Sequence, residues 1–122
     1  MWGVYDLALP GNASRVEPSF TTRAESSDDS VVVHVDGDID VATAHRLRAD
    51  MSQLVDSGPN LVLDLNEVSF MDTIGISALL ATRTAVMEHG GSLAVRNPSS
   101  TVRRVLEMTG LYTMLTETPQ PE

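Results

Sequence analysis

The chain has 122 residues with 42% hydrophobic and 20% charged side chains, which is the size and composition of one soluble globular domain. Its formal net charge of −9 argues against a direct nucleic-acid partner, because phosphate contacts need clustered basic side chains, and it favours a partner with a basic face. Because cysteine, a signal peptide and an apolar run of ~18 residues are all lacking, we expect a cytoplasmic protein without disulfides, cysteine-ligated metals or a membrane span.

The N-terminal part of the chain predicts a β-hairpin. Residues 1–16 show no sustained hydrophobic period, and we expect them to be a flexible extension or a poorly fixed extra strand. Residues 19–23 and 31–35 are rich in β-branched and aromatic side chains, which favour strands. The polar cluster over 24–30 predicts the turn that joins these two strands.

Helices and strands alternate in the remaining chain. Apolar residues recur at helical spacing between Ala44 and Val55, and the continuous apolar run over 61–65 has the length of a buried strand. The pattern predicts, in order, a helix that begins near Val41 and stops at Gly58-Pro59, a strand over 61–65, a helix from Asp72 or Thr73 to His89, a strand over 93–95, a helix from Ser100 to Thr109 and a short strand over 112–115. This order indicates an α/β domain with a mixed sheet of four or five strands and packed helices. The acidic residues 117–122 are expected to form a disordered tail.

The segment over residues 70–75 places the hydroxyl of Thr73 where a central strand ends and a helix begins. Such points carry function in open α/β sheets. The first amides of a helix lack internal partners and the helix dipole is positive there, so a phosphate on Thr73 would be accommodated, and Gly75 leaves room for close approach. The simpler alternative is that Asp72 or Thr73 only caps the helix, worth about 1 kcal/mol. Capping and switching are compatible with each other.

Other chemistry has little support in the sequence. Asp36, Asp38 and Asp40 have the spacing of a calcium loop, but Val41 stands where that loop needs glycine and Leu47 where it needs glutamate. We therefore expect a solvated turn, with Asp40 capping the following helix. The histidines share no metal-ligand spacing, and neither a Gly-x-Ser-x-Gly elbow nor a phosphate-binding glycine loop occurs. No metal, no cofactor and no enzymatic activity are predicted.

Two segments resemble the STAS domain family, named for sulfate transporters and anti-sigma-factor antagonists. Residues 33–40 are similar to the family's apolar strand followed by Gly-Glu-Leu-Asp, and residues 63–72 are similar to its central strand. Phe-Met-Asp-Thr-Ile-Gly-Ile over 70–76 is similar to the family's Phe-Met-Asp-Ser-(Ser/Thr)-Gly-Leu. The resemblance covers residues 17–116, which we expect to form a single domain. Within the family, the sequence is most similar to the single-domain antagonists.

The resemblance implies a partner switch. The unmodified domain would bind an anti-sigma factor, a GHKL-type serine/threonine kinase, and so free the sigma factor. The kinase would phosphorylate Thr73 and end the binding, and a phosphatase is a further expected partner. Asp40, Asp72, Thr73, Ile74 and Gly75 would form the partner-binding surface. This chain departs from the family in having threonine at 73 and, at Ile74, no second hydroxyl.

Two other functions remain open for the same fold. The helix start at Thr73 could bind the phosphate of a small ligand or nucleotide, which would make the domain a sensor. Alternatively, the domain could be an unphosphorylated scaffold subunit in a signalling complex, with Thr73 as a cap and nothing more.

Overall fold

The computed structural model describes residues 5–6, 20–56 and 59–116, and within them a mixed five-stranded sheet has the order β1-β2-β3-β4-β5. β1–β2 and β2–β3 pair antiparallel, whereas β3–β4 and β4–β5 pair parallel. The strands are β1 (Tyr5–Asp6), β2 (Phe20–Ser27), β3 (Ser30–Gly37), β4 (Asn60–Glu67) and β5 (Ser92–Arg96). The helices are α1 (Ala44–Val55), α2 (Thr73–Glu88), α3 (Ser100–Met108) and α4 (Tyr112–Thr116). The predicted α/β class is confirmed.

The β2–β3 hairpin is confirmed, but its turn is much shorter than predicted. β2 continues through the polar residues up to Ser27, and the turn consists of Asp28 and Asp29. Asp28 has φ 51°, a left-handed conformation that aspartate tolerates in tight turns. The strand continues because Ala24 is fully buried on its inner side, whereas its polar neighbours point away from the core.

The N-terminal expectation is met in part. Tyr5–Asp6 forms the short extra strand, which pairs with Ala24 and Arg23 of β2. The rest of the expected extension, and the expected disordered tail over 117–122, lie outside the described residues.

The predicted strand over 112–115 is wrong, because this segment is helix α4. Gly110, with φ 76°, ends α3, and Leu115 N–H donates to Leu111 O at 3.0 Å in the first turn of the new helix. Leu115 is fully buried, and Leu111, four residues earlier, packs against the core. The spacing of the two leucines is therefore helical, although tyrosine and threonine favour strands.

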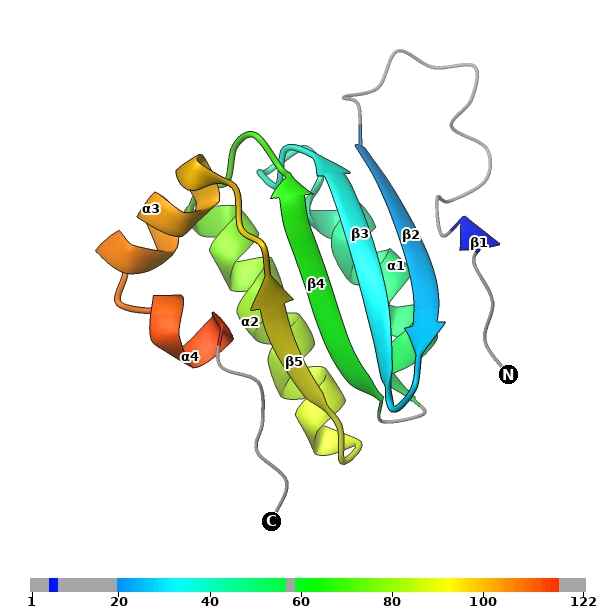
Figure 1. Cartoon of the computed structure of the whole chain (residues 1–122). Coiled ribbons are helices and arrows are strands. Elements are labelled where there is room, and N and C mark those ends of the chain that lie inside the picture. Colours follow the sequence, from blue (N-terminus) through cyan, green and yellow to red (C-terminus); the bar gives the residue numbers. More distant parts are fainter. Residues whose placement is uncertain (1–4, 7–19, 57–58, 117–122) are drawn as a thin grey trace, which may run out of the picture.

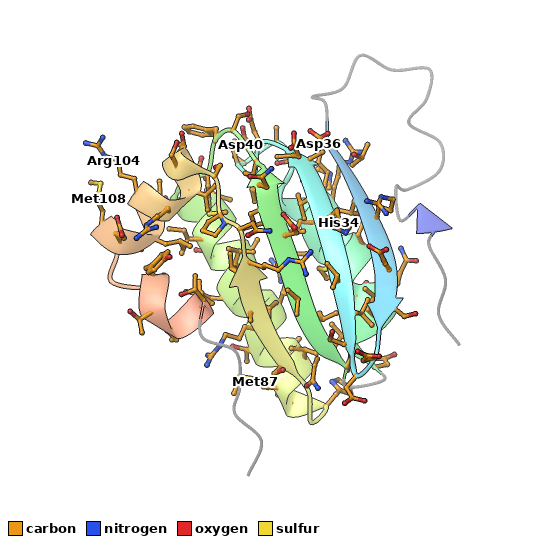
Figure 2. All side chains as sticks on the ribbon, in the orientation of Figure 1. His34, Asp36, Asp40, Met87, Arg104 and Met108 are labelled. Carbon is orange, nitrogen blue, oxygen red and sulfur yellow. The ribbon has the colours of Figure 1, made fainter. Side chains whose placement is uncertain are left out.

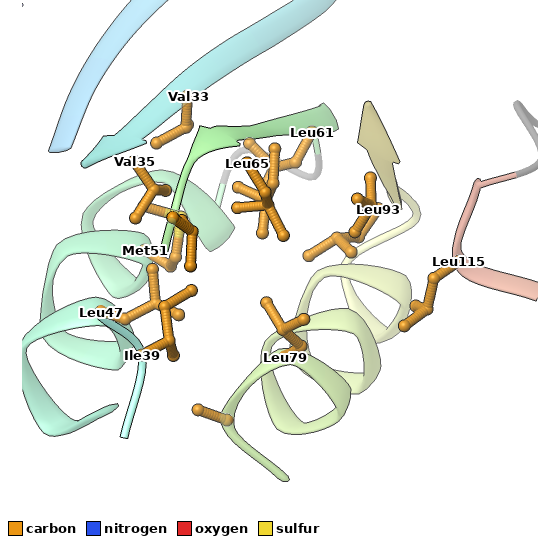
Figure 3. Close-up of a cluster of buried hydrophobic side chains, with 14 of the residues drawn as sticks. Val33, Val35, Ile39, Leu47, Met51, Leu61, Leu65, Leu79, Leu93 and Leu115 are labelled. Carbon is orange, nitrogen blue, oxygen red and sulfur yellow. The ribbon is translucent and has the colours of Figure 1, made fainter. Parts of the chain in front are cut away.

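Helices α1 and α2 cover one face of the sheet, and α3 and α4 lie beside β5 (Figure 1). No helix in the described ranges covers the opposite face (Figure 1). The core fills the space between the sheet and the two covering helices (Figure 3). Its fully buried side chains include Val33 and Val35 of β3, Leu61, Leu63 and Leu65 of β4, Leu47 and Met51 of α1, and Leu79 of α2. None of the described helices is long and apolar enough to cross a membrane.

The parallel strands β3 and β4 determine where a site can form. Both strands end at the same edge of the sheet, and α1 and α2 begin there (Figure 1). The loops that follow β3 and β4 therefore meet at this edge, as is usual for binding sites of open α/β sheets.

Candidate functional site

The loops after β3 and β4 are joined by backbone hydrogen bonds. Ile39 and Met71 form an isolated parallel bridge. Ile39 N–H donates to Phe70 O at 2.9 Å, and Asp72 N–H donates to Ile39 O at 3.4 Å. These bonds bring the segment around Asp40 next to the start of α2.

Asp72 is the N-cap of α2. Its backbone is extended (φ −115°, ψ −170°), and its Oδ1 accepts a hydrogen bond from Gly75 N–H at 3.0 Å. Thr73 is the first helical residue and is exposed. Of the two residues predicted as possible caps, Asp72 is therefore the cap of α2. The hydroxyl of Thr73 takes no part in it.

Gly75 is buried and packs against the loop after β3. A Cβ atom at this position would lie 2.3 Å from Ile39 O and 3.0 Å from Met71 Cγ, so no larger residue fits without movement of the backbone. Gly75 therefore contributes to the site from beneath its surface, by letting the first turn of α2 approach the loop after β3.

Asp40 was predicted to cap the helix that follows it, and this prediction is wrong. Helix α1 begins at Ala44, with Thr43 as its N-cap residue, whereas Asp40 Oδ1 accepts from Ala42 N–H at 2.9 Å. The carboxylate of Asp40 thus closes a turn before the helix, as aspartate does when it bonds the backbone two residues on. Buried Thr43 holds this turn, because its Oγ1 donates to Asp38 O at 2.5 Å and accepts from Asp40 N–H at 3.1 Å.

Acidic side chains gather at the same edge of the sheet. Asp38 Oδ1 accepts a hydrogen bond from Ser69 Oγ at 2.7 Å, which adds a side-chain link between the two loops. Asp36 and Glu67 are paired across β3 and β4 at the ends of these strands. Asp36 and Asp40 are labelled at this edge in Figure 2. Among the residues that the structure describes, no three acidic, histidine or cysteine side chains are placed to hold a metal ion.

Three large apolar side chains are exposed on the segments that meet here. Val41 is 74% exposed, Phe70 46% and Ile74 45%. Only Ile74 was among the predicted site residues, because an apolar residue in a sequence is first assigned to the core. The signal for Phe70 was its alternation with Met71, which is buried.

The face of the sheet that no described helix covers carries a row of charged and polar residues. None of them was among the predicted site residues. Arg23, His34, Asp64 and Arg96 are paired in register across β2, β3, β4 and β5. Arg96 Nη2 lies 3.1 Å from Asp64 Oδ2. Burial raises the pKa of the Asp64 carboxyl, but hydrogen bonds from the backbone of Asn66 and from Arg96 outweigh this effect, so the pKa lies below its ordinary value.

Comparison with known proteins places this arrangement in a family. The sequence matches the family model of the STAS domain over residues 21–120. The anti-sigma-B factor antagonist of Bacillus subtilis (strain 168) is 33% identical over 87 residues, which cover 71% of this chain and 80% of that protein. The anti-sigma F factor antagonist of Paenibacillus polymyxa is 28% identical over 87 residues, which cover 70% and 74%.

A solved structure agrees with the sequence matches. The crystal structure of an anti-sigma factor antagonist from Mycobacterium paratuberculosis has a TM-score of 0.69 and 33% identity, and the match covers 84% of this chain and 87% of that chain. The family model spans most of the sequence, and the mixed sheet with its covering helices is the fold of the solved relative. The chain therefore belongs to the STAS domain family.

Proposed function

We propose that this protein is an anti-sigma-factor antagonist that binds a GHKL-type kinase anti-sigma factor and thereby frees a sigma factor. Phosphorylation of Thr73 by that kinase ends the binding, and a phosphatase restores it. The names of the relatives support the general role. The proposed phosphorylation rests on the position of Thr73. This residue is exposed as the first residue of α2, and Asp72 supplies the cap.

The physical effect of phosphate at this position follows from its surroundings. A phosphate adds a charge of about −1.5 to −2 and a strongly hydrated group. The amides and the dipole at the start of α2 stabilise that charge in the free protein. Within a complex, however, the phosphate and the neighbouring carboxylates of Asp72 and Asp40 would have to be desolvated together. Phosphorylation therefore favours the dissociated state.

The test uses the purified full-length chain, its purified kinase anti-sigma factor and ATP. Intact mass is expected to rise by one phosphate in the wild type and to stay constant in Thr73→Ala, while Thr73→Ala still binds the kinase. Thr73→Glu is expected to bind more weakly, although glutamate carries less charge than phosphate.

A matched control lies on the same helix. Thr84 is an exposed threonine of α2, three turns from Thr73, so Thr84→Glu adds the same charge far from the proposed surface. Its affinity is expected to equal that of the wild type. Phosphate on a residue other than Thr73, or equal affinity before and after phosphorylation, contradicts the proposal.

A further inference from the structure

The exposed apolar side chains Val41, Phe70 and Ile74 lie on three backbone segments that the Ile39–Met71 bridge draws together. Scattered exposed apolar residues are normal on a protein surface and need no explanation. These three, in contrast, all lie within three residues of the Ile39–Met71 bridge, on the loop after β3, the loop after β4 and the first turn of α2. Grouped apolar exposure of this kind marks interaction sites.

The backbone that carries these side chains is held in place. Phe70 O accepts from Ile39 N–H at 2.9 Å, and Ala42 N–H, next to Val41, donates to Asp40 Oδ1 at 2.9 Å. Ile74 lies between the capping residue Asp72 and its hydrogen-bond donor Gly75. The three side chains are thus presented by ordered backbone, and a partner that binds them has little ordering entropy to overcome.

The charge around this surface indicates whether a second copy of the chain or a basic partner binds there. The same strand ends and loops carry five carboxylates, those of Asp36, Asp38, Asp40, Glu67 and Asp72, and the whole chain has a formal net charge of −9. A second copy of the chain docked on the same surface would bring two such acidic edges together, which like-charge repulsion opposes. A partner with basic groups around an apolar cleft is complementary.

We propose that Val41, Phe70 and Ile74 are the apolar anchors of the antagonist, which insert into an apolar cleft of the anti-sigma factor that is rimmed by arginine and lysine. This inference rests on the proposed function and adds to it the chemistry of the contact. Anchors at the centre of an interface carry most of the affinity, and the charged rim contributes less.

The test measures the Kd of the purified, unphosphorylated full-length chain for its purified kinase anti-sigma factor. Phe70→Ala is expected to raise the Kd at least about tenfold, and Ile74→Ala and Val41→Ala less. Met108→Ala is the matched control, because Met108 is a large apolar residue of α3 and is 77% exposed. Its Kd is expected to stay within about twofold of the wild type.

A second pair of variants tests the basic rim. Asp40→Asn is expected to raise the Kd severalfold, whereas Asp29→Asn, in the exposed β2–β3 turn at the other end of the sheet, is expected to leave it unchanged. Thermal unfolding of each variant checks that the fold is retained. Equal effects of Asp40→Asn and Asp29→Asn overturn the basic rim.

The outcomes separate the inference from the function on which it rests. If Thr73→Glu weakens binding but the alanine variants of Val41, Phe70 and Ile74 behave like Met108→Ala, the anchors are overturned and the proposed function stands. If the wild type does not bind the kinase, both are overturned. If sedimentation shows a dimer of the free chain that Phe70→Ala dissociates, a second copy covers this surface and the inference is wrong.

Discussion

The carboxylate of Asp72 is used within α2, whereas the hydroxyl of Thr73, next in the chain, lies at an exposed position. The cap and the proposed phosphorylation site therefore belong to different side chains. The proposed phosphorylation of Thr73 would not remove the acceptor of the bond from Gly75 N–H to Asp72.

This separation predicts opposite behaviour for two neighbouring alanine variants. Asp72→Ala is expected to lower the free energy of unfolding by about 1 kcal/mol, because it removes the acceptor for Gly75 N–H. Thr73→Ala is expected to change that free energy by less than about 0.5 kcal/mol, because an exposed first-turn residue loses no cap. Urea denaturation of both variants measures the difference. A larger loss for Thr73→Ala than for Asp72→Ala would show that Thr73 is the cap.

Among the elements, the candidate site depends on the close approach of α2 to the loop after β3. Gly75 makes this approach possible, because Ile39 O occupies the space that a side chain would need. The same carbonyl accepts from Asp72 N–H, so a hydrogen bond joins the helix start to the loop that carries Asp40. A change beneath the surface can therefore alter the surface itself.

Gly75→Ala is expected to lower the free energy of unfolding by about 1 to 3 kcal/mol through overpacking, although helix propensity alone would favour alanine. It is also expected to weaken partner binding, since the shift of Ile39 displaces Asp40 and Val41. Ser77→Ala, at an exposed position of the same helix, is the control and is expected to be close to neutral in both measurements. Unchanged stability of Gly75→Ala would mean that the contact with Ile39 relaxes freely.

The sheet predicts a pH dependence of stability through Asp64 and Arg96. Because the pKa of Asp64 is lowered in the folded state, its stabilising effect is present above the unfolded pKa of about 3.9 and is lost as the pH falls through the lower folded value. Arg96→Met is therefore expected to cost up to about 1 kcal/mol at pH 7, because the arginine is half-exposed, and less near pH 3. Urea denaturation at both pH values checks this, with exposed Arg104→Met as control. An equal cost at both pH values contradicts the electrostatic origin.

Local patterns allowed most elements to be predicted, and tertiary contacts explain the errors. The continuous apolar run of β4 and the glycine stop after α2 are local signals, and both elements were predicted close to their observed bounds. The strand predicted over 112–115 was wrong because only packing against the core reveals that Leu111 and Leu115 share a helical face. The hairpin turn was overestimated for the same reason, since burial of Ala24 extends β2.

The candidate site was predicted around the start of α2. Thr73 and Asp72 were chosen because a strand end and a helix start are visible in the sequence, and Asp40, Ile74 and Gly75 were chosen from the family resemblance. The exposure of Phe70 and Val41 was missed, because it depends on how two loops distant in sequence are joined. Outside the candidate site, the buried hydrogen bond from Thr22 Oγ1 to Asp50 Oδ2, at 2.8 Å, could not be predicted either, since its residues lie 28 positions apart.

In the molecule as a whole, the edge of the sheet where α2 begins combines acidic side chains with exposed apolar ones. The chain has 17 acidic and 8 basic residues. The carboxylates near Thr73 act over distances of about a Debye length, roughly 8 to 10 Å at physiological salt, whereas apolar side chains act only in contact. In the proposed complex, these carboxylates would therefore influence the approach of a basic partner, and the apolar anchors would influence how long the complex lasts.

This division predicts different kinetics for the two parts of the surface. Between about 50 and 500 mM salt, the association rate constant of the wild type with its purified kinase anti-sigma factor is expected to fall at least about tenfold, because screening weakens the attraction between the acidic edge and a basic partner. The dissociation rate constant is expected to change little over the same range. Phe70→Ala is expected to do the reverse: it raises the dissociation rate constant and leaves the salt dependence of association intact.

Surface plasmon resonance over a salt series measures both constants. Met108→Ala is the control, since its side chain is exposed on α3 and both constants should match the wild type. An association rate that does not respond to salt would show that the acidic edge does not face the partner, even if Phe70 does.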